Sequence, residues 1–175
     1  MAYKPDPYIE KAKKSLLIVG EGKSEKVFLK HLKRLYSCQN NTSINIKNGK
    51  GGSAEAVIRK AIKEPPEYFQ KIVVVDYDRM TKAAKDLARK GSIKTIINRP
   101  CIEGLFLHIK TGNSRIHQRT PTCKREFKKE YLKNKASNFN LEKCEKIFPK
   151  EELDECCSEI PQLNKIIKAI KQGHL

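Results

Sequence analysis

Four short β-rich segments alternate with helical patterns in the first hundred residues, and this alternation restricts the folds that the chain can adopt. The segments cover residues 16–19, 44–46, 72–75 and 93–97. The third segment, Ile-Val-Val-Val, gives the strongest strand signal. Strands that alternate with helices form βαβ units, so the pattern predicts an α/β fold with a mostly parallel four-stranded sheet flanked by helices. In such a sheet, functional groups gather beyond the carboxyl ends of the strands.

Local signals predict where the helices begin and end. Ser24 is the expected N-cap of the first helix. A second helix over residues 54–62 should stop before Pro65, which cannot continue a helix. A third helix is expected to contain Met80 and to be closed by Gly91.

The second half of the chain is basic. Residues 110–150 carry twelve Lys or Arg against four acids. A predicted helix in this segment holds Phe127 and Tyr131, which we expect in the core, and four basic residues that we expect to contact a phosphate backbone: Lys124, Arg125, Lys128 and Lys129. Two further helical patterns follow, separated by Pro161.

The net charge of +17 comes from 37 Lys and Arg against 20 Asp and Glu. Such an excess favours a polyanionic partner, above all nucleic acid, although a plain solvated, lysine-rich surface would also produce it. Among the histidines, His31 is expected on the outer side of the first helix and His117 in a solvated loop.

The cysteine pattern and the hydropathy predict a reduced, cytoplasmic protein. The six cysteines show no Cys-x-x-Cys spacing and are expected to be free thiols, not disulfides or a zinc site. No apolar segment before Leu16 matches a secretory signal, and no apolar run reaches the length of a membrane span. A membrane partner is therefore not expected.

The stretch Gly22-Lys23-Ser24 looks like the end of a nucleotide-binding P-loop, but the spacing excludes that motif. A P-loop needs a glycine five positions before Gly22, and that position is Leu17, inside the first strand. Too few residues remain between strand and helix for a loop that wraps a phosphate. The carboxylate of Glu21 is then the more informative group.

Acidic residues follow the first and third strands. Glu21 lies between two glycines after the first strand, and Asp76 and Asp78 follow the third. In extended backbone, residues two apart face the same side, so the two aspartates would repel each other unless a cation neutralised them. Oxygen ligands of this kind favour Mg²⁺ or Mn²⁺. An Asp-x-Asp that only caps the next helix is the alternative.

Taken together, these motifs resemble the TOPRIM domain of topoisomerases, primases and several nucleases, and within it the RloB-like branch associated with bacterial restriction and phage defence. Branch members often carry an aromatic residue and a tryptophan around the last motif, where this chain has Ile102, Gly104 and Phe106 and no tryptophan at all. Three stretches carry the resemblance: Glu21-Gly22-Lys23-Ser24-Glu25, Gly49-Lys50-Gly51-Gly52-Ser53 and Pro100-Cys101-Ile102-Glu103.

The resemblance implies a TOPRIM (compact Rossmann-like) catalytic core over residues 14–110 and a basic helical extension over residues 111–175 packed on that core. It implies that Glu21 acts as general acid/base or metal ligand, and that Asp76 and Asp78 hold Mg²⁺ or Mn²⁺.

Other residues of the matching motifs leave two interpretations open. Glu25 and Glu103 could complete a second metal site, or could be first-turn acids favoured by the helix dipole. Lys50, in a glycine-rich turn before a helix, is a candidate phosphate-binding residue, whereas Lys23 is expected to be a plain surface lysine.

The expected function is Mg²⁺-dependent cleavage of DNA or RNA in bacterial phage defence, with a protein partner from a defence system as a further expectation. Two alternatives keep the fold. The protein could bind nucleic acid without cutting it, or its acids could hold a metal for a mononucleotide in nucleotidyl transfer or sensing.

Overall fold

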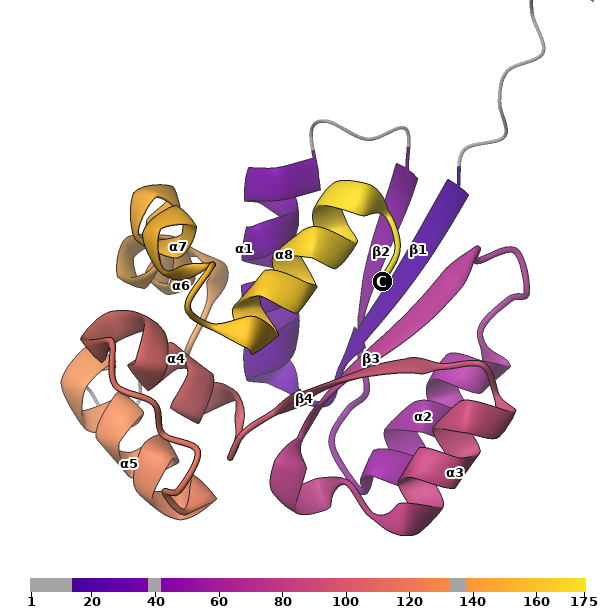
Figure 1. Ribbon diagram of the computed structural model, residues 1–175, viewed down its shortest axis with the longest axis horizontal. Helices are drawn as coiled ribbons and strands as arrows, with labels where there is room; N and C mark the ends of the chain where they lie inside the picture. The colour runs from indigo at the N-terminus through magenta and orange to yellow at the C-terminus, as the bar shows by residue number, and fades with distance from the viewer. Residues whose placement is uncertain (1–13, 38–41, 133–137) are drawn as a thin grey trace, which may run out of the picture.

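The computed structural model describes residues 14–37, 42–132 and 138–175, and its centre is a four-stranded sheet. All strand pairs are parallel and the strand order is β2-β1-β3-β4 (Figure 1). The predicted α/β class and the parallel four-stranded sheet are therefore confirmed. The strands are β1 (Lys14–Gly20), β2 (Thr42–Asn48), β3 (Gln70–Asp76) and β4 (Lys94–Asn98).

Helices cover both faces of the sheet, which explains why its two central strands are continuously apolar. Along β1, Leu16 and Ile18 face one hydrophobic core, whereas Leu17 and Val19 face the other. The second core is closed by α2 (Ala54–Lys63) and α3 (Lys82–Lys90), which lie side by side on that face (Figure 1). The first core lies against α1 (Lys23–Tyr36) and the C-terminal helices.

Among the described residues, the C-terminal half of the chain forms five helices, which lie on the same side of the sheet as α1. The last of them contacts both α1 and β4, so the end of the chain packs against the sheet (Figure 1). These helices are α4 (Ile102–Thr111), α5 (Thr120–Tyr131), α6 (Leu141–Ile147), α7 (Lys150–Cys156) and α8 (Pro161–Gln172).

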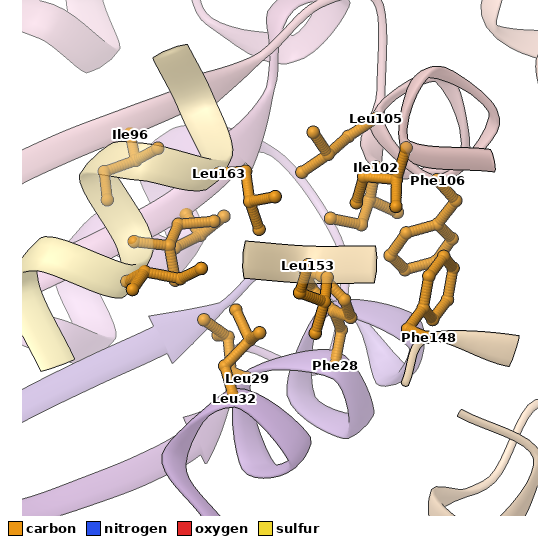
Figure 2. Packing of buried hydrophobic residues seen from close by; sticks show 14 of the residues in the cluster. Phe28, Leu29, Leu32, Ile96, Ile102, Leu105, Phe106, Phe148, Leu153 and Leu163 are labelled. Carbon is orange, nitrogen blue, oxygen red and sulfur yellow. The ribbon is translucent and has the colours of Figure 1, made fainter. Parts of the chain in front are cut away.

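A cluster of phenylalanine rings joins α1 to the C-terminal helices. The ring of Phe106 on α4 has its centroid 4.9 Å from that of Phe28, 5.0 Å from that of Phe127 and 5.0 Å from that of Phe148. Figure 2 shows Phe28, Phe106 and Phe148 meeting beside Leu153 of α7. Phe127 is buried, as expected, and Tyr131 stacks on it. The sheet and the C-terminal helices thus share one core.

Several local predictions are wrong in detail. The N-cap of α1 is Gly22, so Ser24 lies inside the helix. Met80 precedes α3, whose N-cap is Thr81. His31 is buried, not exposed, because α6 and the segment after it cover that side of α1. Its Nε2 lies 2.7 Å from the carbonyl oxygen of Phe148.

Other local predictions are confirmed. Gly91 closes α3, and Pro161 occupies the first turn of α8. His117 is exposed in the segment between α4 and α5. The five cysteines within the described ranges are free thiols, whereas Cys38 lies outside those ranges. None of the described helices combines the length and the apolar character needed to span a bilayer.

We predict that Phe148→Ala lowers the free energy of unfolding by about 3–5 kcal/mol, because it empties the shared core of a fully buried ring. Urea unfolding followed by circular dichroism and by tyrosine fluorescence should still give one coincident transition. Ile116→Ala, at an exposed position, is the control and should change the free energy of unfolding by less than about 0.5 kcal/mol. Two separate transitions in the Phe148 variant would contradict a shared core.

Candidate metal centre

Parallel pairing brings the ends of three strands to one edge of the sheet. Glu21 follows β1, Asp76 is the last residue of β3, and β4 ends at Asn98, which pairs in register with Asp76. The chain then enters α4, whose N-cap is Cys101 and whose first turn contains Glu103. The predicted gathering of acids at this edge therefore has a simple topological cause.

Glycines allow the close approach that places Glu21. A Cβ atom on Gly20 would lie 2.6 Å from the Cβ of Glu25, so the connection from β1 to α1 has no space for a side chain there. The glycine-rich turn after β2 lies against the same connection: the N–H of Gly49 donates to the carbonyl of Gly20 at 2.7 Å, and that of Gly51 donates to the carbonyl of Glu21 at 2.8 Å. The turn thus fixes the backbone that carries Glu21.

The side chain of Glu21 is buried and bonded at both oxygens. Oε2 accepts a hydrogen bond from the backbone N–H of Asp76 at 3.2 Å, and Oε1 lies 3.1 Å from Nε of Arg79. Burial raises the pKa of Glu21, and the bond to Asp76 and the charge of Arg79 oppose that rise. Arg79 also donates to the carbonyl of Gly52 at 2.6 Å, so it connects Glu21 to the glycine-rich turn.

Asp76 lies at the centre of the acidic group. Its Oδ1 accepts a hydrogen bond from the N–H of Ile102 at 2.9 Å, which joins the end of β3 to the first turn of α4. Its pKa is raised to about 8, first by burial and then by the charges of Glu25, Glu21 and Glu103. The charges of Glu25, Glu21 and Glu103 thus each disfavour the ionised form of Asp76.

Glu25 occupies the first turn of α1, where its Oε2 accepts a hydrogen bond from the N–H of Gly22 at 3.0 Å. This is the first-turn position that the sequence left open, and the bond to Gly22 also caps the helix. Glu25 is nevertheless buried among the other acids, and burial together with the charges of Glu103 and Glu21 raises its pKa to about 7. Glu25 therefore both caps α1 and belongs to the acidic group.

Three donor groups converge closely enough to hold one cation. A carboxylate oxygen of Asp76, the sulfur of Cys101 and a carboxylate oxygen of Glu103 all lie within 4.8 Å of one another. Glu103 Oε2 is buried and has no hydrogen-bond partner within the described residues. A buried carboxylate oxygen without a partner is costly, so this donor set fits a divalent cation. Burial raises the pKa of Cys101, and a bound metal would favour its thiolate.

Lys124 of α5 interacts electrostatically with this group. Partial burial acts to lower its pKa, but the charges of Glu103 and Asp76 raise it above the ordinary value. The structure thus brings together Glu21, Glu25, Asp76, Glu103 and Lys124 from the sequence-based set. Lys124 partly offsets the negative charge of the site.

The other predicted phosphate-binding residues lie elsewhere. Arg125, Lys128 and Lys129 are exposed along α5. Lys50 has a positive φ of 67° in the glycine-rich turn and lines a pocket of about 430 Å³ beside β2 and α2. Three further lysines line that pocket: Lys47, Lys60 and Lys63.

The expected geometry of Asp78 is wrong. Extended backbone stops at Asp76, and residues Tyr77–Arg79 form a short 3-10 helix, η2, so the alternation of a strand does not reach Asp78. Asp78 is exposed at the rim, and its charge raises the pKa of Glu21. The structure places it outside the group formed by Asp76, Cys101 and Glu103.

Sequence reasoning missed three residues of this edge. Cys101 had a usable signal, because it stands two positions before Glu103 at the start of a helix that follows a strand. Arg79 and Asn98 had no comparable signal. Asn98 is fully buried, and neither polar atom of its amide has a partner among the described residues. Its register opposite Asp76 makes it a candidate to orient the group that the acids bind.

A family model described as RloB-like protein matches residues 16–174. The chain belongs to the RloB-like family. The match extends from β1 through α8 and so covers both the sheet and the C-terminal helices. Comparisons with curated proteins and with solved structures find no match.

We predict that Asp76→Asn makes the metal-free protein more stable at alkaline pH. The folded protein holds a proton on Asp76 that the unfolded chain releases, so this stabilisation is complete below about pH 4 and is lost as the pH rises through about 8. Urea unfolding in a chelator at about pH 5 and about pH 9 should show a smaller loss of stability in Asp76→Asn than in the wild type. Asp86→Asn changes a half-exposed carboxylate on α3, away from the acidic group, and should retain the wild-type loss. Equal losses in all three proteins would show that Asp76 is not protonated in the fold.

We also predict that Cys101→Ser weakens binding of Cd²⁺ or Zn²⁺ by more than about tenfold and that of Mg²⁺ by much less, because a thiolate selects softer metals. Calorimetric titration and the sulfur-to-cadmium absorption band would measure the two effects. Cys144→Ser removes another buried thiol, on α6, and is the matched control. Unchanged cadmium binding in Cys101→Ser would exclude the thiol as a ligand.

Proposed function

We propose that this RloB-like protein is a metal-dependent nuclease that cleaves phosphodiester bonds of nucleic acid in bacterial phage defence. One observation carries the proposal: the buried carboxylates of Glu21, Glu25 and Asp76 and the half-buried Glu103 gather at the carboxyl edge of a parallel sheet. Beside Asp76 and Cys101, Oε2 of Glu103 has no hydrogen-bond partner among the described residues. Such a group is unfavourable unless protons or a cation reduce its charge, and a divalent cation is the neutraliser that also serves phosphodiester chemistry.

Asp76, Cys101 and Glu103 would hold the metal. Mg²⁺ and Mn²⁺ are the candidates for the two carboxylates, and the thiol shifts the preference toward Mn²⁺. Bound there, the metal would polarise a phosphoryl oxygen and lower the pKa of a bound water. Glu25 would contribute its negative charge from the first turn of α1, and Lys124 of α5 would contribute a positive charge.

Two cationic side chains of the site suit a phosphate diester. Lys124 interacts with the acids and would donate a hydrogen bond to a phosphoryl oxygen that approaches the metal. Glu21 holds the exposed Arg79 at the rim of the site through the contact between Oε1 and Nε, and Nη1 of the same guanidinium donates to the carbonyl of Gly52. Glu21 in this role positions a cation, in addition to any part it takes in proton transfer.

The charge of the chain supports a nucleic-acid substrate. The net charge of +17 attracts a polyanion, and Arg125, Lys128 and Lys129 lie exposed on the same helix that carries Lys124. A phosphate backbone that crosses the acidic site could continue along α5. Contacts of this kind give affinity without sequence specificity, which suits a nuclease that acts on foreign nucleic acid.

We predict that Asp76→Asn and Glu103→Gln each reduce cleavage by more than about a hundredfold, because both remove a ligand of the metal. Wild type and variants would be incubated with single- and double-stranded DNA and RNA in Mg²⁺ or in Mn²⁺. Asp86→Asn is the surface control and should cleave like the wild type. Equal cleavage by all the proteins would identify a contaminating activity.

Asp78→Asn tests the assignment of the ligands more finely. Asp78 is exposed on η2, outside the group of donor atoms, so we expect it to retain far more activity than Asp76→Asn. A loss of cleavage activity as large as that of Asp76→Asn would indicate that Asp78 is a metal ligand after all. A wild type that binds nucleic acid but cleaves none of the four substrates with either metal would favour a non-catalytic binding protein.

A further inference from the structure

Two exposed side chains at the rim of the acidic site stack on each other. The guanidinium carbon of Arg99 lies 4.0 Å from the centroid of the Tyr77 ring. Arg99 is exposed, and 46% of the surface of Tyr77 is accessible. In the part of the chain that the structure describes, neither the guanidinium nor the phenol hydroxyl has a hydrogen bond or ion pair. The pair is therefore preformed and has unused polar groups.

The position of this pair follows from strand register. Asp76 pairs with Asn98 across β3 and β4, and Tyr77 and Arg99 are the residues that follow them. The N–H of Tyr77 donates to the carbonyl of Pro100 at 3.2 Å, which holds the two chain segments together beyond the sheet. Tyr77 thus stands one residue from the carboxylate at the centre of the candidate metal site, within the reach of a single nucleotide.

Tyr77 is not the only exposed aromatic residue among the described residues, so exposure alone does not make it a candidate for a role at the site. Phe69 is 57% exposed, and Lys14 Nζ lies 4.7 Å from its ring centroid. Phe69 precedes β3 and Tyr77 follows it, so the two rings lie at opposite ends of a strand that spans roughly 23 Å. Of these two residues, Tyr77 is the one that directly follows Asp76. Phe69 is consequently a matched control for any role of Tyr77.

We propose that Tyr77 and Arg99 form a stacking platform for an unpaired nucleobase, and that the substrate is single-stranded where it crosses the site. This inference rests on the proposed nuclease function. A base within a duplex has both faces covered by its neighbours, so only an unpaired base can stack on a protein side chain. A stacked guanidinium keeps its N–H groups free for phosphate oxygens, and stacking accepts every base.

The first test measures binding in a chelator, where metal-dependent cleavage cannot contribute. Fluorescence anisotropy would follow the wild type with labelled single-stranded DNA and RNA oligonucleotides and with the matching duplexes. We expect Tyr77→Leu to weaken single-strand binding about tenfold and duplex binding far less. Tyr77→Phe keeps the ring and should bind like the wild type, as should Phe69→Leu. Thermal unfolding would confirm that all variants are folded.

An abasic nucleotide, moved one position at a time along the oligonucleotide, tests the contact itself. The wild type should lose about tenfold in affinity when the missing base is the one that stacks. In Tyr77→Leu the same abasic oligonucleotide should bind no more weakly than the intact one, because both partners of one contact are then absent. Arg99→Gln should retain part of this sensitivity, since the tyrosine ring remains.

The binding and cleavage results separate this inference from the nuclease proposal. A wild type that cleaves single strands, together with a Tyr77→Leu variant that binds them equally well, overturns the platform and leaves the nuclease intact. Loss of single-strand affinity in Tyr77→Leu, with no cleavage by the wild type, leaves the platform and removes the nuclease. Equal weakening on single strands and duplexes, or no binding by the wild type, also overturns the platform.

Discussion

The hydrogen bond from the N–H of Ile102 to Asp76 Oδ1 joins the two parts of the acidic site, the end of β3 and the start of α4. It connects the end of a central strand to the first turn of α4, and α4 carries Cys101, Glu103 and the ring of Phe106. The acidic group and the aromatic core are therefore attached to the same helix. Burying a carboxylate destabilises a fold unless the group is bonded. Here the bond of Asp76 connects the acidic site to the helix that packs in the aromatic core.

The carboxylates of the site disfavour ionisation, but hydrogen bonds to the backbone hold them in place. Burial and mutual repulsion raise the pKa values of Glu21, Glu25 and Asp76, yet each carboxylate keeps at least one hydrogen bond to the backbone. These bonds fix where the oxygens point. Preorganisation of this kind would reduce the rearrangement needed for the proposed cation to bind, at some expense in the stability of the metal-free protein.

Much of the fold could be predicted because its signals are local. Apolar runs, helical spacing and punctuation by glycine and proline indicate the strands and most helices, and parallel topology then brings Glu21, Asp76 and Glu103 to one edge. Asp78 was misplaced because no sequence pattern indicates that extended backbone stops at Asp76. His31 was misplaced because the segment that buries it lies more than a hundred residues away along the chain. Packing between distant segments produces no periodic pattern in the sequence from which it could be predicted.

The shared phenylalanine core sets the order in which the site can be completed during synthesis. The strands can pair once residue 98 has been made, but Cys101, Glu103 and Lys124 come later, and Phe148 completes the cluster that holds their helices. A nascent or truncated chain that ends before Phe148 has the acids without the scaffold that fixes them. Under the nuclease function proposed above, this order would keep unfinished chains harmless to the cell that makes them.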